Sequence, residues 1–177
     1  RSTDGNVTLT GGATQASGAI VADAGDITAT GKDITATVGE ELTLSAKEGT
    51  IAADNVTATN VQAKTLAASG AVSVNDGVLI ATGTGADASS VGSLVLDSTQ
   101  GMVGELTVAN AAALTNGTSL AADKLTMTGG NLTVGSNADT KGGTTLVVDA
   151  LNLGGNGLLI DPAWGTASTN VAVGSFT

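Results

Sequence analysis

The chain has 177 residues, a formal net charge of −10 and neither Cys nor His. Only 1% of its residues are aromatic although 41% are hydrophobic, so small and branched aliphatic side chains must fill the core that large rings usually dominate. This composition excludes nucleophilic catalysis by Ser–His or Cys–His pairs within the chain and the usual transition-metal ligands, and its charge disfavours nucleic acids and anionic membranes.

Short segments in which apolar and polar residues alternate recur along the whole chain. Alternation with a period of two indicates β-strands, and the abundant Thr and Val favour them. In chain order, the clearest predicted strands are residues 7–10, 27–30, 34–38, 42–45, 56–59, 72–74, 94–96, 106–108, 125–128, 132–134 and 151–153. Gly, Asn and Asp, which form turns readily, separate them, as at residues 11–12, 25–26, 75–77 and 154–157.

The spacing of the strand starts predicts the architecture. Apolar starts follow one another at residues 51, 56, 61, 66, 72 and 78, five or six positions apart, which is too short for stable hairpins. A three-sided solenoid accommodates this spacing, because each short strand then pairs in parallel with the strand one turn further on. At about 20 residues a turn, we expect eight or nine rungs in a single β-solenoid over residues 1–177.

Two segments fit the alternation less well. Residues 108–125 carry enough Ala and Leu for a helix, but Thr115-Asn116-Gly117-Thr118 interrupts them, and we expect further short strands there. Residues 83–92 are small and polar, and we expect them to form a loop that projects from a corner.

The repeated I-T-A-T, V-T-A-T and L-T-V units, with G-D, N-D-G and G-G-N corners, resemble the passenger regions of Gram-negative autotransporters and the filamentous-haemagglutinin type of two-partner secreted protein. The segments 157–165 and 171–174 also look like such passengers. The resemblance implies a right-handed parallel β-helix that is exported through an outer-membrane barrel. It also fits the scarcity of Cys, since a disulfide could lock the structure before export. The chain opens without a basic, apolar leader and ends within a strand-like segment, so we expect a piece of a longer passenger.

Paired carboxylates are the remaining route to catalysis, as in glycoside hydrolysis. The candidate pairs are Asp23/Asp26, Asp54/Asp76 and Asp149/Asp161. Sugar sites usually also need aromatic platforms, and the chain has a single Trp. We therefore expect no enzyme and assign no catalytic, cofactor-binding or metal-binding residue; a polysaccharide-acting enzyme ranks third among the hypotheses.

A ligand-binding solenoid, either ice-binding or calcium-dependent, ranks second. Outward Thr pairs resemble ice-binding surfaces, at Thr8/Thr10, Thr28/Thr30, Thr35/Thr37, Thr57/Thr59 and Thr126/Thr128, but their uneven spacing favours ordinary solvent-facing strands. Asp23, Asp26 and Asp33 could hold Ca²⁺, although solvated corner carboxylates explain them better. Residues 154–158 are similar to a calcium-binding nonapeptide, with Leu158 where an Asp should stand.

Two further features have plain structural explanations. Four N-x-[ST] sequons, at Asn6, Asn55, Asn116 and Asn131, follow from alternating Asn and Thr. Trp164 could anchor a ligand, but we expect it to cover a core edge or a loop.

These observations favour a structural and adhesive role. The expected protein is a segment of a secreted adhesin on the surface of a Gram-negative bacterium, acting in cell adhesion, aggregation, biofilm formation or virulence. Its partners would be a host-cell or matrix receptor, or neighbouring cells through self-association. We expect no nucleic-acid partner and no membrane insertion of this segment.

Overall fold

The computed structural model describes residues 1–29, 31–135, 142–161 and 168–177, and it confirms the predicted fold class. The described part of the chain is all-β, with 66% of its residues in strands that stack in parallel as a β-solenoid. Among the described residues, the helical structure is one 3-10 turn, η1 at Gly85–Asp87.

The strands grow longer toward the middle of the solenoid. The first five are β1 Val7–Thr8, β2 Thr14–Ala16, β3 Gly18–Val21, β4 Ile27–Ala29 and β5 Ile34–Ala36. Long strands that run around corners follow: β6 Leu42–Ala53, β7 Val56–Ala81, β8 Ser89–Asp97 and β9 Gln100–Val108. The last six are β10 Ala112–Thr115, β11 Ser119–Met127, β12 Leu132–Val134, β13 Thr144–Asn152, β14 Leu158–Ile160 and β15 Thr169–Phe176.

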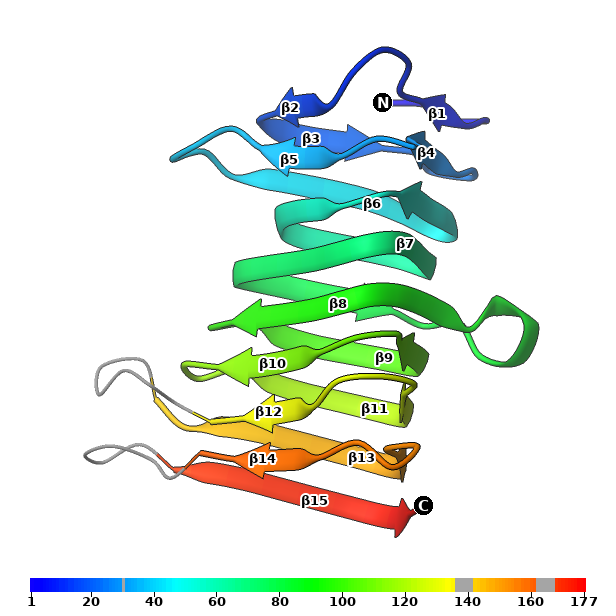
Figure 1. The fold of residues 1–177 in the computed structure, drawn as a ribbon. Coiled ribbons are helices and arrows are strands. Elements are labelled where there is room, and N and C mark those ends of the chain that lie inside the picture. The colour runs from blue at the N-terminus through cyan, green and yellow to red at the C-terminus, as the bar shows by residue number, and fades with distance from the viewer. Residues whose placement is uncertain (30, 136–141, 162–167) are drawn as a thin grey trace.

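The strands form three faces around one axis, and all the pairings between the described strands are parallel (Figure 1). Face A contains β1, β4, the C-terminal part of β6, residues 65–68 of β7, the N-terminal part of β8, and the C-terminal parts of β9, β11, β13 and β15. Face B contains β2, β5, residues 56–57 and 71–75 of β7, the C-terminal part of β8, β10, β12 and β14. Face C contains β3, the N-terminal part of β6, residues 60–63 and 78–81 of β7, and the N-terminal parts of β9, β11, β13 and β15. As the chain descends in Figure 1, face B runs leftward in front and face C runs rightward behind, which is the right-handed sense.

The solenoid has about seven turns, close to the eight or nine rungs expected. The turns differ in length. Ile51 pairs with Leu66, 15 positions later, whereas Leu125 pairs with Leu151, 26 positions later. The number of residues in a turn therefore varies along the solenoid.

The core consists of aliphatic columns, as the lack of aromatic residues requires. Each face points at least two columns inward, and the members of a column pair in register with their equivalents on neighbouring turns. Fully buried members of these columns include Ile27, Ile51, Leu66 and Leu125 on face A, Ile34, Val56, Leu94 and Leu132 on face B, and Leu44, Val61, Leu79 and Leu120 on face C.

One corner between faces B and C carries threonines inside the solenoid. Thr99, Thr118 and Thr144 are completely buried. The Thr99 hydroxyl donates to the Val74 carbonyl oxygen at 2.7 Å, and the Thr118 hydroxyl lies 2.6 Å from the Thr115 carbonyl oxygen. Since buried hydroxyls are costly without partners, these bonds let the core accept a polar column at the turn.

The two ambiguous segments are largely as predicted. Residues 108–125 contain β10 and the start of β11, so they form strands and no helix. Residues 82–88 do project from a corner (Figure 1), but the predicted loop was too long, because Ser89 begins β8. The expected strand start at Val78 is one residue early: Leu79 is the fully buried residue there.

Candidate functional site

Three of the four sequon asparagines support corners of the solenoid. The side-chain oxygens of Asn6, Asn55 and Asn131 accept the backbone N–H groups of Asp26, Ala71 and Gly157, at 2.9, 2.6 and 3.0 Å. Each acceptor lies one turn before its donor. The side chain thereby links successive turns where the corner interrupts the backbone ladder.

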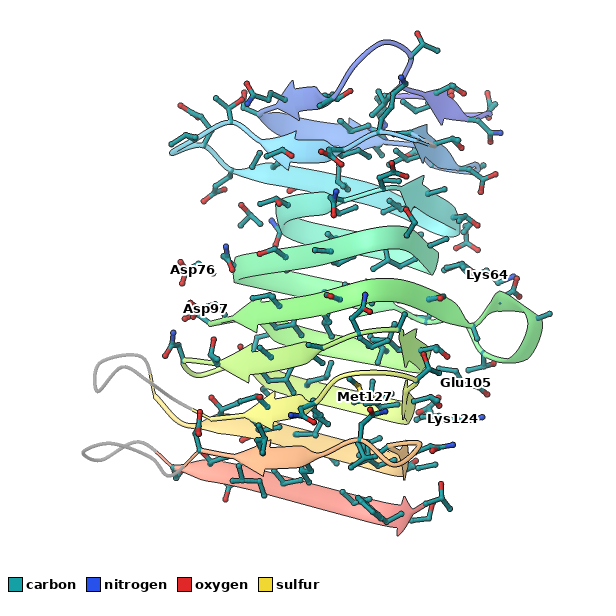
Figure 2. All side chains as sticks on the ribbon, viewed as in Figure 1. Lys64, Asp76, Asp97, Glu105, Lys124 and Met127 are labelled. Atoms are coloured by element: carbon teal, nitrogen blue, oxygen red, sulfur yellow. The ribbon has the colours of Figure 1, made fainter. Side chains whose placement is uncertain are left out.

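The fourth sequon asparagine, Asn116, belongs to a polar corner between faces B and C. Its side-chain amide donates to Asp97 at 3.1 Å. Asp76, Ser98 and Asn116 all adopt positive φ, between 52° and 53°, a conformation that Asp and Asn tolerate better than most residues. Figure 2 shows Asp76 and Asp97 at this corner on successive turns.

Of the three candidate carboxylate pairs, two are separated in the structure and one shares a corner. Asp54 lies between β6 and β7, at the corner from face A to face B, whereas Asp76 lies at the next corner within β7. Asp149 lies within β13, where face C turns into face A, whereas Asp161 follows β14 on face B. In each of these two pairs, the structure therefore places the two carboxylates at different corners.

Asp23 and Asp26 do share a corner, between β3 and β4, but both have partners. Asp23 forms an ion pair with Arg1 at 2.8 Å, and Asp26 accepts the backbone N–H of Thr50 at 2.7 Å. Asp33, the third calcium candidate, accepts the Asn55 side-chain amide at 2.7 Å beside β5. In the described part of the chain, no group of three or more carboxylates gathers where a metal ion could be held.

The outward Thr pairs do not form one array. Thr8 pairs with Thr28 on face A, but Ala52 follows Thr28 in that column. Thr35 pairs with Thr57 on face B, a different side of the solenoid. Thr30 lies outside the described residues. The Thr pairs thus make short patches on two faces.

The glycine-rich segment 154–157 is a corner, as its plain interpretation predicts. Gly154 and Gly155 have φ of 55° and 84°, and the Asn156 side chain donates to the Leu153 carbonyl oxygen at 2.7 Å. Trp164 lies outside the described residues, so its expected role stays a prediction.

The projecting corner loop, residues 82–88, is fastened to the turn before it. Lys64 forms an ion pair with Asp87 at 2.6 Å, and the Thr65 hydroxyl donates to the Asp87 carbonyl oxygen at 2.8 Å. The Glu105 N–H, on the turn after, donates to Gly83 at 2.9 Å. The loop is therefore held on both sides.

Face C carries an apolar outer surface that the sequence analysis did not identify. Ile80 pairs with Met102, Met102 with Ala121, and Ala121 with Val147. Met102 and Val147 are 53% and 46% exposed. We call these four residues, with Ala172 next to Val147, the apolar stripe. Consecutive apolar residues such as Met102-Val103 and Val147-Val148 are its sequence signal, because strict alternation would put a polar residue outside.

A shallow notch of about 210 Å³ interrupts the apolar stripe. Ala121 and Ala122 line it from the middle turn, Met102, Val103 and Val147 line it from the neighbouring turns, and Asp123 and Asp149 complete its lining. The notch exists because a methyl group at Ala121 stands between two longer side chains. It combines an apolar base with two carboxylates and is the candidate binding site of this chain.

No described helix has the length and apolarity to cross a membrane. Comparison with protein-family models, with curated proteins and with solved structures gave no match. The candidate site is therefore argued from its own geometry.

Proposed function

We propose that this chain is a structural and adhesive segment of a secreted bacterial surface protein. In this role it acts as a stiff spacer whose outer faces and corner loops contact a receptor on host cells or matrix, or neighbouring cells. The supporting sequence evidence is the resemblance of its repeated units to autotransporter and filamentous-haemagglutinin-like passengers. The observation that carries the proposal is the parallel ladder, which passes from β1 to β15 along one path of paired strands.

The ladder gives a physical basis for the spacer role. Strand-to-strand hydrogen bonds run along the axis of a solenoid, so bending it must stretch bonds on one face and compress another. With about seven turns and roughly 4.8 Å between paired strands, the described segment is on the order of 30 Å long. Corner loops such as residues 82–88 extend sideways from it without interrupting the ladder.

The surface chemistry is compatible with contact between large partners. The chain is acidic, with 16 Asp and Glu against 6 Lys and Arg, which keeps copies apart in solution. The apolar stripe is an exposed region of the kind that marks interaction surfaces.

Adhesion of coated beads tests the proposal. Beads carrying the folded chain are incubated with cultured epithelial cells, with fibronectin or collagen surfaces, and with beads of the same kind. We expect retention on at least one of these surfaces, with competition by the soluble chain. Beads carrying the heat-unfolded chain are the control. Retention no greater than that of the control on every surface would refute the adhesive role.

A further inference from the structure

The notch on face C combines three properties that together define the chemistry of a partner. The first is its position in an otherwise apolar column. Upstream, the same outward column holds Val21, Ser45 and Gln62, which pair in succession. From Ile80 onward the column becomes apolar, and the notch lies where Ala121 separates Met102 from Val147.

The second property is the size and lining of the notch. A volume of about 210 Å³ suits one long side chain and is too small for a folded element. The exposed side chains of Met102 and Val147 provide apolar contacts on two sides. Long cationic side chains bury their aliphatic stems on such surfaces while their charged ends stay in water.

The third property is the pair of carboxylates at the edge. Asp123 and Asp149 follow the paired residues Ala122 and Val148 and precede the paired residues Lys124 and Ala150. They therefore lie on adjacent strands, about 4.8 Å apart in backbone spacing, and both are exposed. Within the described residues, the ion pairs are Arg1–Asp23 and Lys64–Asp87, so neither notch carboxylate belongs to one.

Lys124, the cation that follows Asp123 in the sequence, has an acidic neighbour on another strand. Lys124 pairs in register with Glu105 on the preceding strand, and Figure 2 shows both at the edge of the solenoid on successive turns. Their opposite charges face each other across the ladder. The two notch carboxylates thus leave a local negative charge beside an apolar surface.

We propose that the notch binds an arginine side chain presented by a partner polypeptide. The aliphatic part of that arginine lies on Met102, Ala121 and Val147, and its guanidinium donates hydrogen bonds to Asp123 and Asp149. Arginine fits better than lysine because its planar group has five donors and bridges two acceptors. This inference rests on the proposed adhesive function, since it names the chemistry of the partner.

Charge also decides between this partner and a second copy of the chain. Two copies with a net charge of −10 each repel one another. The chain's single arginine, Arg1, already pairs with Asp23 at 2.8 Å. A second copy therefore does not supply the cation that the notch requires.

Titration with a short peptide tests the inference on the folded chain. The probe is a soluble heptapeptide with one central arginine flanked by threonine and valine, and the readout is methyl and amide NMR shifts. We expect saturable shifts at Met102, Ala121 and Val147, with a dissociation constant on the order of 1 mM or tighter. A citrulline peptide of the same sequence should bind at least about tenfold more weakly, because it keeps the shape and lacks the charge.

Two double variants of the chain distinguish binding by the notch carboxylates from non-specific attraction to the acidic chain. The double variant Asp123→Asn with Asp149→Asn should weaken binding of the arginine peptide at least about tenfold. The matched control, Glu40→Gln with Glu41→Gln, removes two exposed charges between β5 and β6, away from the notch, and should change binding less than about twofold. Ala121→Leu, an outward substitution that fills the notch, should also weaken binding.

The outcomes distinguish this inference from the proposed function. Equal loss in both double variants, or shifts centred away from face C, would overturn the arginine site. Absence of peptide binding while coated beads still adhere would overturn the site and leave the adhesive role intact. Peptide binding at the notch without bead adhesion would support the site and refute the adhesive role.

Discussion

The central turns and the last turns of the solenoid share their inward columns but differ in how they turn corners. In the centre, β7 runs for 26 residues without interruption, and Ile51 pairs with Leu66 after only 15 positions. In the last turns, separate strands alternate with Gly- and Asn-rich corners, and Leu125 pairs with Leu151 after 26 positions. The additional described residues lie between the strands, so face positions are constrained while the length of the connections varies.

The largest expected effect on stability comes from an insertion that shifts the register of one strand within a face. Inserting one glycine after Ala67, within β7, moves the following inward residues to the outside. We expect the midpoint of thermal unfolding, measured by circular dichroism, to fall by about 10 °C or more. The same insertion after Gly85 in the corner loop should lower it by less than about 2 °C. Equal effects would contradict the distinction between faces and corners.

Removing one large member of a column should be the next largest effect. Leu66 and Leu125 lie in the same face A column and are 1% and 0% exposed. Replacing either with Ala should lower the free energy of unfolding by about 2–5 kcal/mol. We expect the larger loss at Leu66, because an uninterrupted strand on both sides of it relaxes less into the cavity. Urea unfolding measures this, with the half-exposed Leu159→Ala as a control that should change little.

A side chain at a stacked glycine tests how closely the corners approach. A Cβ on Gly49 would meet the carbonyl oxygen of Gly25 one turn away, so Gly49→Ala should cost about 1–3 kcal/mol of unfolding free energy. Gly12 has no atom within 4 Å of the equivalent Cβ position. The Gly12→Ala variant should therefore unfold at nearly the same urea concentration as the parent, and a matching loss would argue against stacked corners.

The buried threonine column should give the smallest of these effects. Thr118→Val keeps the shape but leaves the Thr99 N–H without its 3.3 Å acceptor, and we expect a loss of about 1–2 kcal/mol. Thr126, at a half-buried outward position on face A, is the matched control and should tolerate Val. An unchanged midpoint for Thr118→Val in urea would show that the column contributes no net stability.

Much of the fold followed from local patterns. Segments such as Ile27-Thr28-Ala29 and Leu132-Thr133-Val134 alternate strictly, and each forms a strand with its apolar residues inside. The candidate site did not follow from such patterns. Asp123 and Asp149 are 26 positions apart, and only the register of β11 on β13 brings them to one notch. The pair proposed from sequence, Asp149 with Asp161, is nearer in the chain but lies on different corners.

The alternation of small aliphatic residues with Thr and Ser, and the absence of rings, determined a narrow all-β solenoid, because side-chain direction alternates along any strand and thin layers need no large side chains. The tertiary structure decided the number of turns and the outer neighbours of each residue. Both depend on the number of residues in each turn, which ranges from 15 to 26. That number sets the register of every outward column, and no local sequence pattern encodes it.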